Sequence, residues 1–245
     1  MSEILHNLAQ VKARIAAAAE RADRQPDAVR LVLVTKTVPS EKVLEAVRAG
    51  QHDLGENKVQ EARDKAEALS GEAVNWFMIG HLQTNKVKDV LRFAGEVQSL
   101  DRLPLAEALE RRLQFLGRGL DVLVQVNTSG EASKYGLAPE EVPAFLKELP
   151  AYSALRPRGF MTLATFTSDE AEVRRCFQQL RDIRDRALND APQGAALAEL
   201  SMGMSGDYEW AIEEGATIVR VGQAVFGARP LPDSHYWPGA AGTIG

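Results

Sequence analysis

The stretch Arg30-Leu-Val-Leu-Val-Thr-Lys36 is an apolar run that ends in a charge. Its Leu, Val and Thr residues favour a β-strand and show no helical period, so the run predicts a buried strand. An unpaired ammonium group inside a core is very costly, so we expect Lys36 where the strand leaves the core. A lysine in that place is the usual arrangement for an amine that loses its proton and attacks a carbonyl carbon. A solvated lysine at a strand end fits this stretch, taken alone, equally well.

Strand-like and helix-like segments alternate on the C-terminal side of this stretch, and a helix precedes it. With residues 31–35, strands are predicted over residues 52–54, 75–79, 96–100, 121–127, 158–163, 197–201 and 217–221. Helices are predicted over residues 2–22, 40–49, 57–69, 84–92, 102–116, 139–148, 168–188 and 207–214. Eight strands separated by helices predict the α/β class and a single (β/α)8 barrel. An open doubly wound sheet is the competing fold, and the lack of a Gly-x-Gly-x-x-Gly turn after a strand weighs against it.

Residues at the segment ends support this order of elements. Ser168-Asp169-Glu170 is typical of a helix start, and glycines at 50, 95 and 215 stand where helices are expected to stop. No linker, repeat or low-complexity segment occurs before the Pro/Gly/Ala-rich residues 230–245. We therefore predict one domain over residues 1–229, which includes the N-terminal helix 2–22, and a loosely ordered tail over residues 230–245.

The composition excludes several classes of function. The chain has 245 residues, of which 45% are hydrophobic, and this is enough for one sizeable core. Its net charge of −5 argues against a nucleic-acid partner, which needs a basic face. No window is apolar enough to span a membrane, and the N-terminus does not resemble a signal peptide. Cys176 is the only cysteine, so no intrachain disulfide forms, and we predict a cytoplasmic setting.

Small and polar residues collect where the predicted strands end. In a barrel, the chemistry lies at the carboxyl ends of the strands. Seven of the eight predicted ends carry such residues: Lys36, Glu56-Asn57, Gly80-His81, Asn127-Thr128, Thr162, Ser201–Ser205 and Arg220–Gln223. Together they predict a polar pocket, although some of them must be ordinary turn formers.

The ends of the last two predicted strands form the sharpest pattern. Loops after strands 7 and 8 commonly bind phosphate in such barrels, through backbone N–H groups and a short helix N-terminus. Ser201-Met-Gly203-Met-Ser205-Gly206 fits this description, with glycines for close backbone approach and serine hydroxyls as donors. Gly222 and Gln223 add backbone donors from the neighbouring loop. A Gly/Ser turn that merely joins a strand to a helix remains the alternative.

Other charged residues leave alternatives open. Arg220 has apolar neighbours, so we expect it either to enter the pocket or to pair with a carboxylate. His81 is either an acid–base group or a cap of the turn that follows it. Four scattered histidines and a single cysteine predict no metal site. The charged helices over residues 57–69 and 102–112 are predicted to have solvated faces. Asp53, Glu56 and Glu61 are assigned to turns and helix starts.

An amine-bearing lysine opposite a phosphate site defines a class of ligand. The ligand would carry both a carbonyl group and a phosphate. One candidate is pyridoxal 5′-phosphate (PLP), with its aldehyde on Lys36 and its ring nitrogen facing Arg220. The other is a sugar phosphate in an enzyme that resembles a class I aldolase. The residues alone do not decide between them.

Several blocks in order along the chain resemble the YggS/PROSC family of pyridoxal-phosphate homeostasis proteins. They are Leu33–Thr37, Gly55–Asn57 with Val59–Glu61, Ile79–Lys86, Val126–Glu131 with Ser133-Lys134 and Gly136-Leu137, Arg158-Gly159 with Met161-Thr162, Leu200–Ser205, and Val219–Gly222 with Phe226–Arg229. This resemblance implies the barrel of fold-type III PLP enzymes, like the N-terminal domain of alanine racemase. It also implies that PLP is the cofactor.

The resemblance assigns roles to individual residues. It implies Lys36 as the lysine of the PLP aldimine, Arg220 beside the pyridine nitrogen, and Asn57 near the phenolic oxygen of the ring. The residues implied to hold the phosphate are Ser201, Gly203, Gly222 and Gln223. Gln223 stands where the family more often has threonine, so this position offers its backbone N–H group to the phosphate but no side-chain hydroxyl. Further residues expected in or near the pocket are His81, Met161, Ser205 and Lys134.

The resemblance also bears on catalysis. Alanine racemase takes a second base, a tyrosine, from a C-terminal β-domain, and we expect no such domain here; of the four tyrosines only Tyr135 is expected near the ring. We therefore predict a PLP carrier or regulator without efficient catalysis. The alternative is a PLP-dependent amino-acid racemase that uses Lys36 as its single base.

Expected partners are PLP and, transiently, apo forms of PLP-dependent enzymes, and a monomer is expected. Lys134 is predicted to be a solvated loop lysine, with a secondary cofactor site as the alternative.

Overall fold

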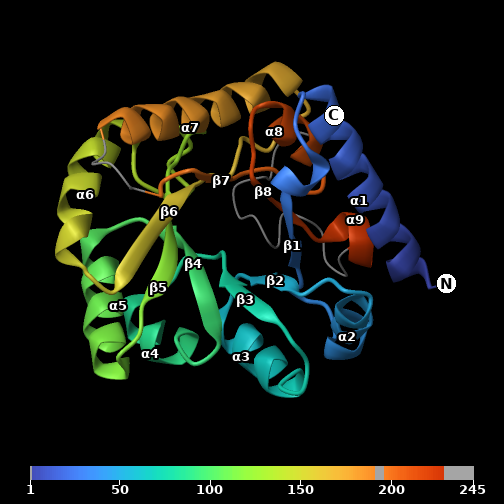
Figure 1. The fold of residues 1–245 in the computed structure, drawn as a ribbon, viewed down its shortest axis with the longest axis horizontal. Helices are drawn as coiled ribbons and strands as arrows, with labels where there is room; N and C mark the ends of the chain where they lie inside the picture. Colours follow the sequence, from blue (N-terminus) through green and yellow to red (C-terminus); the bar gives the residue numbers. More distant parts are fainter. Residues whose placement is uncertain (1, 191–195, 229–245) are drawn as a thin grey trace.

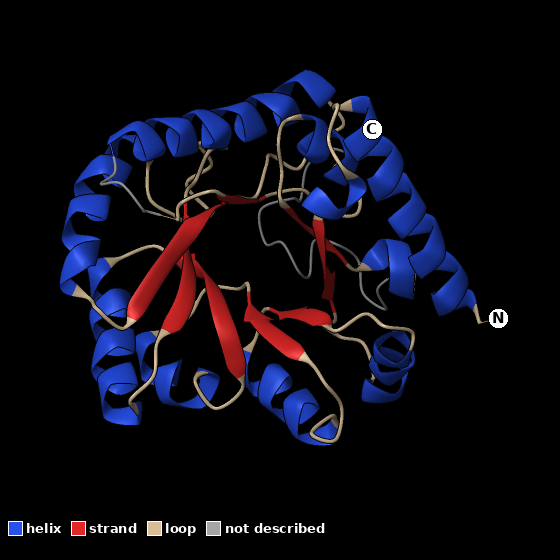
Figure 2. Cartoon of the chain, in the orientation of Figure 1, coloured by secondary structure: helices blue, strands red, loops and turns tan. Residues whose placement is uncertain are grey.

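The computed structural model describes residues 2–190 and 196–228, and within them eight parallel strands close into a barrel. The strands form a ring (Figure 2). They follow chain order around it, and β1 pairs with β8 to close it. Their bounds are β1 Arg30–Val34, β2 Asp53–Glu56, β3 Asn75–Met78, β4 Ala94–Leu100, β5 Leu120–Gln125, β6 Leu155–Met161, β7 Glu199–Ser201 and β8 Ile218–Val221. The predicted barrel is confirmed, and the pairing of β1 with β8 excludes an open sheet.

Helices surround the ring of strands (Figure 1). Their bounds are α1 Glu3–Arg21, α2 Ser40–Arg48, α3 Val59–Ala68, α4 Val87–Val90, α5 Leu103–Leu116, α6 Val142–Glu148, α7 Glu170–Asp190, α8 Tyr208–Glu213 and α9 Gln223–Phe226. The additional helix α1 packs on α2, α8 and α9, beside the point where the barrel closes. The predicted tail over residues 230–245 lies outside the described residues.

Two layers of apolar side chains hold the barrel together. The larger layer lies between the strands and the helices. The inner layer fills the barrel and consists of Val32, Phe77, Leu123, Met161 and Ile218. Side chains alternate between the two faces of a strand, so Val34 follows Val32 into the interior, nearer the carboxyl end of β1. The inner layer is therefore an apolar floor beneath the carboxyl ends of the strands.

The closure of the barrel places Arg220 beside β1. In the parallel pairing of β1 with β8, Val32 stands opposite Arg220 and Leu33 stands opposite Val221. A Cβ atom at Gly222 would lie 2.8 Å from the carbonyl oxygen of Val34, so a glycine is needed where the two strands end. Arg220 consequently lies below the loop that begins after Val34.

The predicted helices agree closely with the structure, except that α4 ends early and the short helix α9 was not predicted. The Asp169 carboxylate accepts the N–H groups of Ala171 at 2.9 Å and Glu172 at 3.2 Å, so the predicted start of α7 is confirmed. Glycines also follow α2 and α8 as predicted. The prediction for Gly95 is wrong, because Gly95 lies within β4. Helix α4 ends earlier than expected, at Val90, and a short turn separates it from β4.

The prediction of solvated helix faces is correct for α5 and for most of α3, with one exception in α3. The Glu107–Arg111 pair of α5 is exposed. Lys65 of α3, in contrast, is only 5% exposed and forms ion pairs with Glu56 and Glu61. Helix α3 packs against β2, so one of its polar positions faces the barrel wall and needs partners there.

Candidate functional site

Lys36 lies on the loop from β1 to α2, just beyond the carboxyl end of β1, and is half-buried. It lines a pocket of about 260 Å³ between the loops that follow β1 and β8. Gly222 and Gln223 line the same pocket from the loop after β8, and Lys42 lines it from α2. The structure therefore brings three of the predicted cofactor residues to one cavity, although they lie far apart in the sequence.

Arg220 is a buried cation beneath this pocket, with 3% of its surface exposed. Its Nη1 donates to Ser201 Oγ at 2.6 Å, and its Nη2 donates to the carbonyl oxygen of Thr162 at 2.7 Å. Burial lowers the pKa of Arg220 to about 10, against the opposing effect of the Asp207 charge, so the guanidinium group stays charged at neutral pH. Within the described part of the chain, Arg220 forms no ion pair. The predicted pairing with a carboxylate is thus not found there.

A chain of hydrogen bonds leads from Arg220 through the barrel interior. Ser201 Oγ donates to Gln98 Oε1 at 2.7 Å, and Gln98 Nε2 donates to Glu96 Oε1 at 2.7 Å. Arg30 Nη2 then donates to Glu96 Oε2 at 3.2 Å near the amino ends of the strands. The Ser201 hydroxyl proton is therefore committed to Gln98.

The loops after β7 and β8 meet through Ser205. Its Oγ accepts the backbone N–H groups of Gly222 and Ala224, each at 3.3 Å. Gly203 has a φ of +93°, and a Cβ atom there would lie 2.6 Å from Ala211 Cβ, so this loop requires a glycine to pack on α8. Two backbone donors at the start of α9 thus converge on one acceptor oxygen.

Asn57 and Met161 occupy different levels of the barrel. Val34 pairs with Gly55, so Asn57 stands opposite Lys36 when this register is continued beyond the strands. Asn57 is half-buried, at the carboxyl end of β2. Met161 is fully buried in the inner apolar layer. It therefore forms part of the floor below the carboxyl ends.

His81 and Tyr135 lie on the rim. Their rings stack with centroids 3.8 Å apart, and His81 Nδ1 lies 3.4 Å from an Asp101 carboxylate oxygen. Lys134 Nζ donates to the carbonyl oxygen of Ala164 at 2.7 Å and also pairs with Glu131. The prediction of a solvated Lys134 is wrong, because its side chain is only 16% exposed and connects the loops after β5 and β6.

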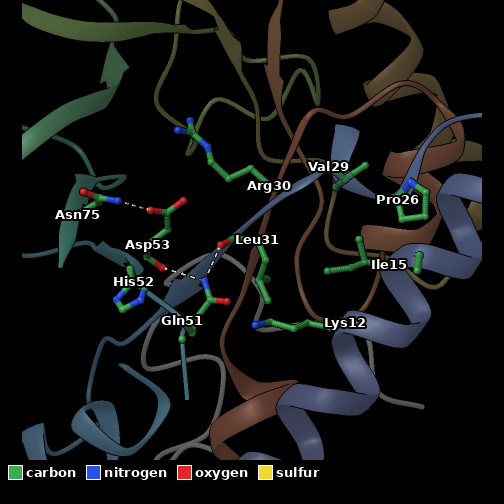
Figure 3. Close-up of a pocket in the computed structure, with 12 residues that line it drawn as sticks. Lys12, Ile15, Pro26, Val29, Arg30, Leu31, Gln51, His52, Asp53 and Asn75 are labelled. Atoms are coloured by element: carbon green, nitrogen blue, oxygen red, sulfur yellow. Dashed lines mark hydrogen bonds between the residues drawn. The ribbon is translucent and has the colours of Figure 1, made fainter. Parts of the chain in front are cut away.

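A second cavity, of about 440 Å³, lies at the opposite end of the barrel between α1 and the starts of β1–β3 (Figure 3). Its polar groups are largely bonded to one another. Asn75 Nδ2 donates to Asp53 Oδ1 at 2.8 Å, and Gln51 Nε2 donates to the carbonyl oxygen of Leu31 at 2.8 Å. The amino ends of barrel strands serve stability rather than chemistry, so the pocket at Lys36 is the better candidate site.

Comparison with known proteins identifies the family of the chain. The model of the alanine racemase N-terminal domain family matches residues 6–230. A pyridoxal phosphate homeostasis protein of Pseudomonas aeruginosa is 44% identical over 229 residues, which make up 94% of this chain and 97% of that protein. The chain belongs to the pyridoxal phosphate homeostasis protein family. A member from Aquifex aeolicus is 42% identical over 226 residues, or 91% of this chain and 96% of that protein. The resemblance described from the sequence blocks is confirmed.

Solved structures extend the comparison. PipY of Synechococcus elongatus PCC7942, in a structure with PLP bound, is 35% identical with a TM-score of 0.82, and the match covers 91% of this chain and all of that one. Alanine racemase of Corynebacterium glutamicum is 14% identical with a TM-score of 0.69, over 94% of this chain and 62% of that one. The second match shows a shared fold only.

Two buried residues near this site, Gln98 and Lys65, were not predicted to matter. Gln98 lies in β4 and accepts a hydrogen bond from the Ser201 hydroxyl group. The end of β4 was the only predicted strand end to which no site residue was assigned. Lys65 lies on a helix predicted to be solvated. The only signal for Gln98 in the sequence is the placement of Glu96 and Gln98 two residues apart in a buried strand, which puts both on one face.

Two kinds of feature are absent from the described residues. No group of His, Cys, Asp and Glu side chains within residues 2–190 and 196–228 is arranged to hold a metal ion. In the same part of the chain, no helix has both the length and the apolar character needed to cross a membrane.

Proposed function

We propose that this protein binds PLP reversibly and acts in the homeostasis of that cofactor, with Lys36 as the residue bonded to it. The names of the relatives and the PLP-bound structure of PipY support this class of ligand. The observation that carries the proposal is the position of Lys36, which shares one pocket with Gly222 and Gln223 above the buried Arg220. When bound, PLP supplies an aldehyde that condenses with a lysine amine and releases water.

The residues of the pocket fit the cofactor. The backbone N–H groups of Gly222 and Ala224 both donate to Ser205 Oγ. Two N–H groups that converge on one oxygen in this way are also suited to bind a phosphate oxygen. We assign the phosphate to the loops that contain Ser201, Gly203, Gly222 and Gln223. Because the Ser201 hydroxyl donates to Gln98, backbone N–H groups are the donors we expect from these loops.

Arg220 and Asn57 complete the proposed site. A charged guanidinium group with no ion pair in the described part of the chain has donors to offer to a neutral ring nitrogen. Arg220 would thus hold that nitrogen without a proton. Asn57, opposite Lys36 in the extended register, is assigned to the phenolic oxygen.

The same arginine supports a carrier rather than an efficient enzyme. A pyridine nitrogen without a proton is a weaker electron sink for carbanions, which lowers the rate expected of carbanion chemistry at this site. Tyr135, the tyrosine predicted near the ring, is 58% exposed and stacked on His81. We propose that the carrier is a cytoplasmic monomer that passes PLP to apo-enzymes. The alternative is an amino-acid racemase with Lys36 as its single base.

Transfer and turnover measurements separate these functions. PLP-loaded protein is mixed with the apo form of a PLP-dependent enzyme, and the recovered activity of that enzyme is followed. In parallel, the loaded protein is incubated with L- and D-alanine. We expect recovered activity and no significant racemisation. Rapid racemisation would establish the alternative, and failure to bind PLP would contradict both functions.

A further inference from the structure

Lys65 is a buried lysine whose ammonium group has three acceptors. It donates to the carbonyl oxygen of Thr35 at 2.5 Å, to Glu56 Oε1 at 2.7 Å and to Glu61 Oε1 at 2.7 Å. Burial raises the pKa of the Glu56 carboxyl group, and the nearby charge of Lys65 opposes this effect. Loss of a partner inside such a cluster is costly, so the three acceptors hold the ammonium group in one place. Lys65 does not line the pocket at Lys36.

The acceptors of Lys65 flank Lys36 on both sides. On one side, the Thr35 carbonyl accepts from Lys65, and the Thr35 hydroxyl donates to Glu56 Oε1 at 2.5 Å. On the other side, the Thr37 N–H group donates to Glu61 Oε1 at 2.5 Å. This is the oxygen that also accepts from Lys65. A single ammonium group therefore holds the chain directly before Lys36 and, through Glu61, directly after it.

The backbone at Thr37 shows why such support is needed. Thr37 has a φ of +65°, a conformation that is unfavourable for a β-branched residue. Residues in this region persist where their surroundings hold them, and they are concentrated at functional sites. The bond from Thr37 to Glu61 supplies that support at the turn from β1 to α2.

We infer that Lys65 is a positioning residue for Lys36. It holds Thr35 directly and Thr37 through Glu61, and so fixes the turn from which the Lys36 side chain enters the pocket. A nucleophile gains from such pre-organisation, because its attack needs the reacting atoms in a narrow range of geometry. This inference rests on the proposed function of Lys36, and it adds residues of α3 that do not touch the cofactor.

Four variants test the inference. Lys65→Met keeps most of the aliphatic stem and removes the ammonium group. Glu61→Ala removes the acceptor for Thr37, whereas Glu61→Gln keeps an oxygen acceptor at that place. Gln51→Leu is the matched control, because Gln51 is 6% exposed and donates to the carbonyl oxygen of Leu31 at the other end of the same strand. It removes a buried hydrogen bond to β1 far from Lys36.

Three readouts are compared. They are the dissociation constant for PLP, the hydrogen exchange of the Thr37 amide in cofactor-free protein, and the midpoint of denaturation. We expect Lys65→Met and Glu61→Ala to weaken PLP binding by about tenfold, the lower range for loss of a group that supports a ligand. Both should also speed exchange of the Thr37 amide. Glu61→Gln and Gln51→Leu should retain PLP binding within about twofold of the wild type, because both keep Lys65 and an oxygen acceptor for the Thr37 N–H group.

Two results would overturn the inference. The first is a Lys65→Met variant that is destabilised but binds PLP as tightly as Gln51→Leu, since its role would then be structural only. If Lys65→Met does not fold, equal PLP binding by Glu61→Ala and Glu61→Gln leads to the same conclusion. Wild-type protein that takes up no PLP would instead contradict the proposed function, and the inference would fall with it.

Discussion

At the scale of single residues, the side chain of Gln98 fixes how Ser201 meets Arg220. Gln98 Nε2 donates to Glu96, so its Oε1 faces Ser201 as an acceptor. The Ser201 hydroxyl has one proton, which goes to Gln98, and its lone pairs are left to accept from Arg220 Nη1. The direction of each bond follows from the one before it. We therefore expect substitutions of Glu96 or Gln98 to alter the hydrogen bond between Ser201 and Arg220.

Replacement of Gln98 with leucine tests this chain. The change leaves the Ser201 hydroxyl proton without its acceptor and Glu96 Oε1 without its donor, so we expect a loss of about 1–3 kcal/mol in the free energy of unfolding. We also expect weaker PLP binding, because the Ser201 oxygen that accepts from Arg220 is no longer held in place by Gln98. Chemical denaturation and PLP titration measure the two effects. PLP binding equal to that of Gln51→Leu would contradict the link to Arg220.

Glu96 gives the chain a dependence on pH. Burial raises the pKa of Glu96 above its ordinary value of 4.5, and the charge of Arg30 opposes the shift. The folded protein therefore binds this proton more tightly than the unfolded chain does. The stability that protonation contributes is complete below pH 4.5 and is lost as the pH rises through the raised pKa.

Replacement of Glu96 with glutamine removes this titration. The free energy of unfolding of the wild type should fall relative to that of Glu96→Gln as the pH is raised from 4.5 towards neutrality. Burial likewise raises the pKa of Glu199, which remains in both proteins, so only the difference between them reports on Glu96. Denaturation curves at a series of pH values measure it. A difference that is constant, or that changes in the opposite direction, would contradict the assignment.

The predictability of the site differs from residue to residue. Lys36, Gly222 and Gln223 were predicted from strand ends and loops, and they line one pocket. Gln98 and Lys65 were not predicted, because their importance depends on which residues other strands and helices bring beside them. Such contacts between distant segments are set by packing and leave little trace in local sequence.

At the scale of elements, alternation and turn residues were sufficient to predict every strand within a few residues. Apolar runs of Val, Leu and Ile mark β1, β5 and β8, because these strands are buried on both faces. The failure at Gly95 has a local cause. A glycine marks a helix end only where a helix reaches it, and α4 stops at Val90.

The start of α7 allows a test at this scale. Asp169→Ala removes an acceptor for two backbone N–H groups, and we expect a loss of about 1 kcal/mol in the free energy of unfolding. Because Asp169 lies on the loop before an outer helix, PLP binding should not change. Denaturation and PLP titration together check both statements. An unchanged stability would contradict the capping role.

At the scale of the whole molecule, the barrel assembles the site. Lys36 lies on the loop after the first strand and Arg220 lies in the last strand, and only the pairing of β1 with β8 brings them together. The count of alternating strands and helices predicted this closure, since eight such units have a known way to close. The identity of the ligand did not follow from the fold. It needed the resemblance of the sequence blocks and the charged, buried Arg220.

The visible absorption spectrum tests most directly whether Lys36 bonds to PLP. Purified protein is mixed with PLP and freed of unbound PLP by gel filtration, and its spectrum is recorded before and after borohydride for the wild type, Lys36→Ala and Lys42→Ala. Lys42 is the matched control, since it is a second lysine that lines the same pocket. We predict a yellow band that borohydride removes in the wild type and Lys42→Ala, with the label on Lys36, and no such band in Lys36→Ala. A wild type that stays colourless with PLP, or a band that persists in Lys36→Ala, would contradict the role of Lys36.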